Sequence, residues 1–285
     1  HGTGKTHTLS HMERRKARCN LWTDTDFVAE YNELIKRVKS ALKTNKAGKA
    51  NVFLFTVPQV TVAPLIRGMG EPKRIPKKGY YFPEYVYFIF RDDTLETNNP
   101  RTLPMDQAIR IDDLIARYNA HIRSTAGELT GKVTGHVVDL ADALFKLAYK
   151  RNHGKPPYVL PPALVTEFEK RFGTGRRPDT RYYHADRHGN WTSGGVVSLD
   201  GVHPSGLGYG LMAYEVLKAM AAAGVKKTNG GPVTATGLPW ARILQRDSLL
   251  QDPIRIMDDL YDIESPVRLG LRFSEMLGRF KRPSR

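Results

Sequence analysis

Two amphipathic helix patterns alternate with two short apolar runs in the first half of the chain, and this alternation constrains the fold most. Apolar residues recur every three or four positions from Phe27 to Leu42 and again from Met105 to Ile122. Each helix pattern precedes a short run rich in β-branched or aromatic residues, at 51–57 and at 136–140. Such runs are typical of strands buried on both faces of a parallel sheet. The order therefore predicts an α/β fold in which the two strands pair in parallel.

Further elements are expected around this core. Asp24 or Thr25 is a suitable cap for the first helix. Residues 141–149 and about 208–223 have helical patterns, and Gly224 ends the second of them. Residues 151–195 contain two proline pairs, and we expect them to be mostly loop.

Composition divides the chain into a core and three other segments. Residues 1–22 are polar, basic and without periodicity, which predicts a tag, a processed end or a truncation scar. The core is expected at 23–225, with an irregular insertion at 68–104 that is rich first in Pro, Gly and Lys and then in Tyr and Phe. This insertion is either a lid or a segment whose aromatic side chains pack on the core, and packing is the commoner role of such stripes. Residues 226–285 are expected to form a helical extension.

The segment most informative about chemistry is the pentapeptide Asp200-Gly-Val-His-Pro, which precedes the helix pattern at 208–223. A catalytic imidazole needs one ring nitrogen facing a nucleophile while the other donates to a carboxylate. A tight loop would let Asp200 hold His203 in this way. The ordinary alternative is a helix cap beside a surface histidine, and the spacing alone favours that alternative.

The longer string from Gly194 to Ala213 resembles the C-terminal catalytic block of the SGNH, or GDSL-like, serine hydrolases, in which an Asp-x-x-His-Pro element supplies the acid and base of the triad. Earlier segments resemble the preceding elements of that family in the expected order, with Gln59 where Asp is commoner: 26–35, 51–65, 111–122 and 136–140. The resemblance covers about residues 23–224. It implies a flavodoxin-like three-layer α/β/α sandwich around a parallel sheet of five strands, of which two are recognisable here.

The activity that the resemblance implies is hydrolysis of carboxylic esters by two-step acyl transfer. His203 would deprotonate a serine and then protonate the leaving alcohol, while Asp200 would orient His203. The expected partner is a small-molecule or lipid-like ester, and no cofactor is expected.

The nucleophile of this family is missing from the sequence. The family carries its serine in a Gly-Asp-Ser element upstream of the helix matched by residues 27–42, and no such element occurs here. We therefore expect a fold that is incomplete on its N-terminal side, with a missing N-terminal segment or a second chain completing the sheet. The alternative function is a catalytically inactive, hydrolase-derived module that binds a ligand through the same cleft.

Other functional signals in the sequence are weaker. The chain has 44 Lys and Arg against 29 Asp and Glu, a formal net charge of +15, but its basic clusters are scattered and no recognition helix accompanies them. We expect no specific nucleic-acid partner. The N-terminal Gly-Thr-Gly-Lys-Thr lacks the upstream glycine of a phosphate-binding loop.

Metal and membrane signals are also weak. A group of histidines and aspartates lacks the spacing of a metal-ligand motif, so no metal site is expected: His184, His188 and His203, with Asp179, Asp186 and Asp200. No apolar stretch approaches the roughly 18–20 residues of a membrane-spanning helix. A single cysteine, Cys19, excludes an intramolecular disulfide, and the compartment stays open, with secretion or the cell envelope among the options.

Overall fold

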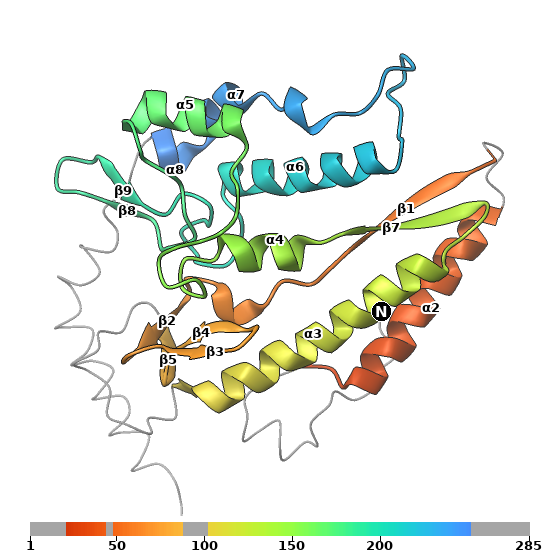
Figure 1. Cartoon of the computed structure of the whole chain (residues 1–285), viewed down its shortest axis with the longest axis horizontal. Helices are drawn as coiled ribbons and strands as arrows, with labels where there is room; N and C mark the ends of the chain where they lie inside the picture. The colour runs from red at the N-terminus through yellow and green to blue at the C-terminus, as the bar shows by residue number, and fades with distance from the viewer. Residues whose placement is uncertain (1–20, 44–47, 88–101, 252–285) are drawn as a thin grey trace, which may run out of the picture.

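A computed structural model of the chain describes residues 21–43, 48–87 and 102–251 (Figure 1). These residues form a mixed α/β fold with one parallel pair of strands and several small antiparallel sheets. The expectations for residues 1–20, for residues 88–101 of the insertion and for residues 252–285 of the C-terminal extension lie outside the described residues.

The parallel pair consists of β1 (Ala50–Phe55) and β7 (Val133–Val138), with Phe53 opposite His136. The predicted parallel pairing is therefore confirmed. Val52 and Leu54 point to one side of the pair, where they pack in a cluster with α2 and α3 residues. Among the described residues, no strand pairs with the other edge of β1.

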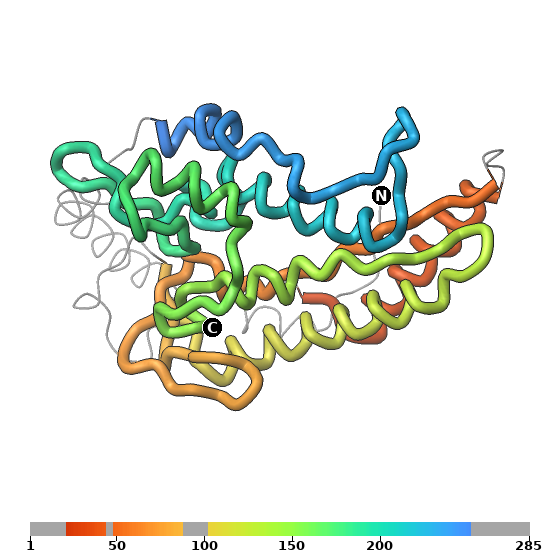
Figure 2. Tube along the Cα trace, turned by 45° about the horizontal axis from the view of Figure 1, so that its top comes forward, coloured from red at the N-terminus to blue at the C-terminus, as the bar shows by residue number. Residues whose placement is uncertain are grey.

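Both predicted helices of the first half are present, as α2 (Asp24–Lys43) and α3 (Met105–Glu128). The predicted cap of α2 is wrong, because the backbone N–H of Asp26 donates to the Thr23 hydroxyl at 2.7 Å. Figures 1 and 2 show α3 along one side of the strand pair and α6 (Gly206–Ala222) on the other.

We expected an irregular insertion, but its described residues form short antiparallel strands. These are β2 (Ile66–Met69), β3 (Lys73–Ile75), β4 (Gly79–Tyr81), β5 (Glu84–Tyr87) and β6 (Leu103–Pro104). β2, β5 and β6 form one sheet, and β3 pairs with β4. Tyr81 and Tyr85 are fully buried in a cluster with Ala108 of α3, so these aromatic side chains pack on the core.

The rest of the described chain surrounds a second apolar cluster. Its elements are α4 (Leu140–Leu147), α5 (Pro162–Phe172), β8 (His184–Ala185), β9 (Trp191–Ser193), α6, the 3-10 turn η3 (Ala235–Gly237), α7 (Trp240–Arg246) and α8 (Ser248–Gln251). The short helices α7 and α8 lie in the segment where a helical extension is expected. Residues 151–195 are mostly loop, as expected, but they also contain helix α5, which is not predicted.

The sequence does contain a signal for α5. Pro162 is the first residue of the helix, where proline's missing N–H leaves no hydrogen bond unmade. Leu164, Phe168 and Phe172 follow at four-residue spacing, and the first two are fully buried in the second cluster. None of the helices in the described part of the chain has the length and apolar character needed to cross a bilayer.

Candidate active site at Asp200 and His203

Asp200 and His203 lie on a closed loop between β9 and α6. The backbone N–H of Ser198 donates to the carbonyl oxygen of His203 at 2.8 Å, and Val197 forms an antiparallel bridge with Pro204. Gly201 adopts a φ of +72°, a left-handed conformation that favours glycine. We call residues 198–203 the Asp-His loop.

The loop brings the two predicted site residues into contact. Nδ1 of His203 is hydrogen-bonded to Oδ2 of Asp200. The other carboxylate oxygen, Oδ1, accepts from the Ser198 hydroxyl at 2.7 Å and from the backbone N–H groups of Val202 and His203 at 2.9 and 3.0 Å. The carboxylate is thus oriented by three donors in addition to the imidazole.

These contacts determine the charge of Asp200. The bond with the His203 ring, the Ser198 hydroxyl and the backbone N–H of Val202 stabilise the ionised form and lower the pKa of Asp200 well below its ordinary value. An ionised carboxylate at Oδ2 favours the proton on Nδ1, which leaves Nε2 as the acceptor of a neutral ring. The His203 side chain is 72% exposed, so a reacting group has access to it.

The Asp-His loop is held against the segment that leaves the carboxyl end of β1. We call residues 57–66 the post-strand segment. Leu65 donates its backbone N–H to the carbonyl oxygen of Gly201 at 2.9 Å. The approach is so close that a Cβ atom on Gly201 would lie 2.7 Å from the Leu65 nitrogen. Glycine at 201 is therefore required by its φ angle and by this contact.

Helix α6 begins directly after the loop and has its own cap. The Ser205 hydroxyl accepts from the Gly208 N–H at 3.0 Å and donates to the carbonyl oxygen of Gly195 at 2.5 Å. Asp200 is consequently not the cap of α6, and its carboxylate is engaged with His203 instead. The ordinary alternative of a helix cap beside an unrelated surface histidine does not describe this arrangement.

Serine hydroxyls near the pair have other roles. Ser198 donates to Asp200, and Ser205 caps α6. Within residues 21–43, 48–87 and 102–251, no hydroxyl is hydrogen-bonded to Nε2 of His203. Gln59, in the segment after β1, ends in a buried Oε1 atom without a hydrogen-bond partner.

Apolar side chains are exposed on the segments that meet at this site. Val202 of the loop is 49% exposed and Tyr209 of α6 is 56% exposed. Phe55, Val57 and Val60, at the end of β1 and in the post-strand segment, are also exposed. Large apolar residues that stay accessible in this way often mark ligand or partner surfaces.

The histidines weighed as metal ligands have local partners. Nδ1 of His184 is bonded to the Thr192 hydroxyl at 2.7 Å, and Asp186 accepts from the backbone of its own turn, including the N–H of His188. In the part of the chain that the structure describes, no group of three or more His, Cys, Asp or Glu could hold a metal ion.

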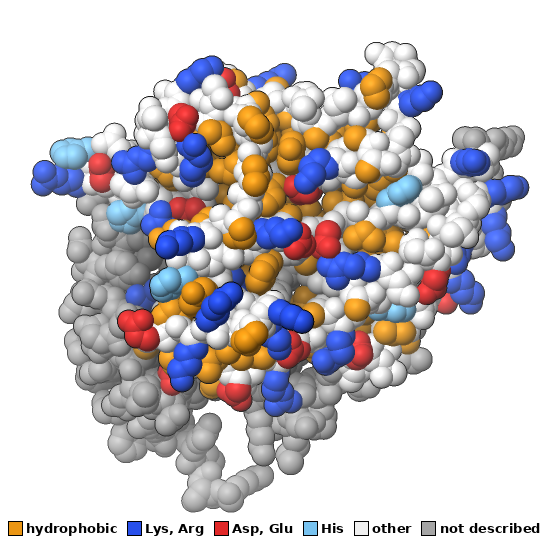
Figure 3. All heavy atoms as spheres, in the orientation of Figure 1, with side chains coloured by type: hydrophobic (Ala, Val, Ile, Leu, Met, Phe, Trp, Pro, Cys, Tyr) orange, Lys and Arg blue, Asp and Glu red, His pale blue; other side chains and the backbone are white. Residues whose placement is uncertain are grey.

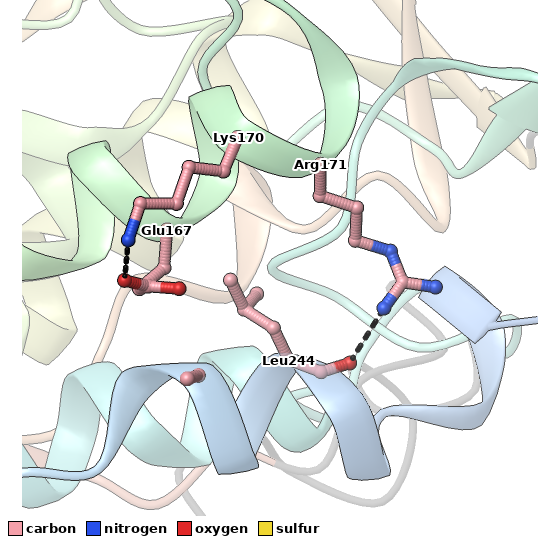
Figure 4. Close-up of a pocket in the computed structure, with 5 residues that line it drawn as sticks. Glu167, Lys170, Arg171 and Leu244 are labelled. Carbon is pink, nitrogen blue, oxygen red and sulfur yellow. Dashed lines mark hydrogen bonds and ion pairs between the residues drawn. The ribbon is translucent and has the colours of Figure 1, made fainter.

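Two other surface features lie apart from the pair. Lys and Arg side chains are dispersed over the face seen in Figure 3, among apolar and acidic groups. A hollow of about 270 Å³ lies between α5 and α7, where Lys170 and Arg171 face Leu244 (Figure 4). Lys170 is paired with Glu167 at 2.6 Å, and Arg171 donates to the carbonyl oxygen of Leu250 at 2.7 Å. The charged groups of the hollow are thus occupied by protein partners.

Sequence reasoning missed two contributors to the geometry of the pair. Ser198 is not among the predicted site residues, although a serine two residues before an aspartate in a tight turn is well placed to donate to its carboxylate. The Leu65 contact joins residues far apart in the chain, and no local signal predicts it.

Comparisons with protein-family models, curated proteins and solved structures find no match to this chain.

Proposed function

We propose that the chain is an SGNH-type hydrolase that cleaves carboxylic esters, with His203 as general base and then general acid. The observation that carries this proposal is the bond from the Asp200 carboxylate to Nδ1 of an exposed imidazole. That bond leaves Nε2 available as the base. Acyl transfer requires this arrangement, in which Nδ1 donates to the carboxylate and Nε2 accepts the proton of the nucleophile.

In this mechanism Nε2 takes the proton of an attacking hydroxyl as its oxygen bonds to the ester carbonyl carbon. The imidazolium that forms is stabilised by the ionised Asp200 and then gives its proton to the leaving alcohol. Water repeats the sequence on the acyl intermediate and releases the acid. Ser198 and the backbone N–H groups keep Asp200 in place during both steps.

The proposed substrate class is an ester with an apolar acyl group. Val202 lies between Asp200 and His203, and Tyr209 follows six residues after His203; both expose apolar surface, so an acyl chain could be sheltered there from water.

The proposed fold is the three-layer sandwich that the resemblance implies. It is supported by the parallel β1–β7 pair, by α3 against both strands and by α6 against β7. A strand beside the unpaired edge of β1 would complete the sheet, because two parallel strands alone are only marginally stable. We propose that an N-terminal segment or a second chain supplies this strand together with the nucleophile.

A second candidate is a catalytically inactive, hydrolase-derived module that binds a ligand through the same site. The observation that favours it is that no hydroxyl among the described residues contacts Nε2 of His203.

Hydrolysis of a short-chain nitrophenyl ester by the full gene product tests the first proposal. His203→Ala should lower kcat/KM at least about a thousandfold, because removal of a triad member typically has an effect of this size. The matched control is His188→Ala, which removes an exposed histidine on the β8–β9 turn and should leave turnover unchanged. Equal turnover by wild type and His203→Ala would refute the assignment.

A fluorophosphonate probe separates the two candidates. An activated serine displaces fluoride from phosphorus and becomes covalently labelled, whereas an inactive module does not react. Labelling that disappears in His203→Ala supports the hydrolase, and absence of labelling together with retained ligand binding supports the module.

A further inference from the structure

The turn after α4 carries a lysine whose ammonium group binds backbone rather than solvent or a carboxylate. Nζ of Lys150 donates to the carbonyl oxygen of Ala63 at 3.0 Å and to that of Ile66 at 2.5 Å. Both acceptors belong to the post-strand segment, and the two residues between them are Pro64 and Leu65. One side chain thus clamps both ends of a four-residue stretch.

This stretch is the one that touches the Asp-His loop. The backbone N–H of Leu65, between the two clamped carbonyls, is the donor to Gly201. Gly201 lies between Asp200 and His203. Three hydrogen bonds therefore connect Lys150 with the Asp-His loop: two from Lys150 to the carbonyls of Ala63 and Ile66, and one from Leu65 to Gly201. Lys150 and His203 are nevertheless 53 positions apart in the chain.

The groups around Lys150 restrict where its ammonium group can lie. Its ammonium lies 5.4 Å from the centre of the Tyr85 ring, and the charges of Arg151 and Asp112 act on it. Burial, together with the positive charge of Arg151, lowers the pKa of Lys150 well below its ordinary value, and Asp112 opposes this only in part. A buried ammonium retains its location only where carbonyl acceptors replace water, as Ala63 and Ile66 do here.

We propose that Lys150 is a positioning residue of the Asp200–His203 pair, acting through the Leu65 contact. The proposal rests on the proposed hydrolase function for its kinetic consequence, but the contact path itself does not depend on that function. Without the clamp, Pro64 and Leu65 lose their fixed location, and the loop that carries Asp200 and His203 loses its support on that side.

Lys150→Met tests the clamp, since methionine keeps much of the apolar stem and removes the donor. We expect kcat for ester hydrolysis to fall about ten- to a hundredfold, because displacement of a catalytic group by about 1 Å has an effect of this size. KM should change less than about twofold, since Lys150 contacts no residue proposed to bind the ester. Lys150→Arg, which keeps charge and donors, should restore most of the activity.

The matched control is Lys146→Met, one turn earlier on α4, where the lysine is exposed and paired with Asp142 at 2.7 Å. This variant should retain wild-type kcat. Lys150→Gln, a neutral donor, provides a second test if Lys150→Met does not fold, and it should give an intermediate loss.

Two measurements do not require turnover. Hydrogen exchange at the Leu65 amide should accelerate at least tenfold in Lys150→Met relative to Lys146→Met, and the NMR signal of the His203 Nδ1–H should broaden or disappear. If wild type lacks esterase activity but these two changes occur, the proposed function fails and the positioning role stands. If both signals are unchanged in folded Lys150→Met or Lys150→Gln, the positioning role is overturned whatever the activity.

Discussion

Asp200 shows how a small loop controls a single side chain. Its carboxylate accepts from the His203 ring, the Ser198 hydroxyl and two backbone N–H groups, although the side chain is 49% exposed. The folded-state pKa of Asp200 is lowered, so the stabilisation from these bonds is complete above the ordinary pKa of an aspartate. It is lost as the pH falls through the lowered pKa. The carboxylate is therefore charged throughout the range in which a histidine base operates.

Ser198→Ala should raise the pKa of Asp200 part of the way towards its ordinary value, because one of the donors to the ionised form is removed. Ester turnover should fall several-fold rather than disappear, since the two backbone donors remain. NMR titration of the Asp200 carboxyl carbon measures the shift. Ser193→Ala is the control, because the Ser193 hydroxyl makes only a 3.5 Å contact with the carbonyl of Tyr182. An unchanged Asp200 titration in Ser198→Ala would contradict the role given to this hydroxyl.

At the scale of elements, helix α6 is placed by its glycines. A Cβ atom on Gly208 would lie 2.1 Å from the carbonyl oxygen of Val196, so the first turn of α6 packs directly on the backbone before the Asp-His loop. The sequence predicted this helix but not the backbone that it contacts. The partner backbone at Val196 lies in a segment of no regular pattern and could be identified only in the folded chain.

Gly208→Ala should destabilise the protein by about 1–3 kcal/mol despite the higher helix propensity of alanine, because the added methyl group overpacks the contact with Val196. Gly127→Ala is the matched control in α3, where a Cβ atom meets nothing within 4 Å. It should stabilise by up to about 1 kcal/mol, since alanine favours the helix over glycine. Urea unfolding of both variants measures the difference. If Gly208→Ala raises the free energy of unfolding as Gly127→Ala does, the contact at Gly208 accommodates the methyl group without strain.

The errors at this scale have physical causes. Helix α5 is not predicted because the adjacent prolines Pro161 and Pro162 favour a loop, although Pro162 begins the helix. The insertion was expected to be irregular because its strands are only two to four residues long, too short to show alternation. Such strands form because Tyr81 and Tyr85 bury their rings against α3.

At the scale of the whole molecule, a buried ion pair joins three parts of the chain. Arg151 and Asp112 are 2.8 Å apart and have side-chain exposures of 0% and 1%. Asp112 of α3 also accepts from the hydroxyls of Thr61 and Tyr81, while Arg151 donates to the Tyr85 hydroxyl. The pair thus connects α3, the post-strand segment and the insertion. Most polar atoms of the two side chains have a hydrogen-bond partner.

Arg151→Met should destabilise the protein by about 3–5 kcal/mol, because it leaves the Asp112 carboxylate buried without its counter-charge. Adding Asp112→Leu should recover part of this loss by removing the isolated charge. Recovery should be incomplete, since the hydroxyls of Thr61 and Tyr81 would then lack their acceptor. Denaturant unfolding of the single and double variants measures both effects. A double variant less stable than Arg151→Met would refute this account of the pair.

The sequence by itself determined the alternating helices and strands, the parallel pairing of β1 with β7 and the Asp200–His203 pair. The helix and strand patterns and the Asp200–His203 pair depend on residues close together in the chain, through periodicity or through a tight loop, and the parallel pairing follows from the order in which helices and strands alternate. Only the tertiary structure decided where the loop rests and what Lys150 and Arg151 bind. These features join segments tens of residues apart, and such contacts form only when the burial of several elements repays the loss of chain entropy.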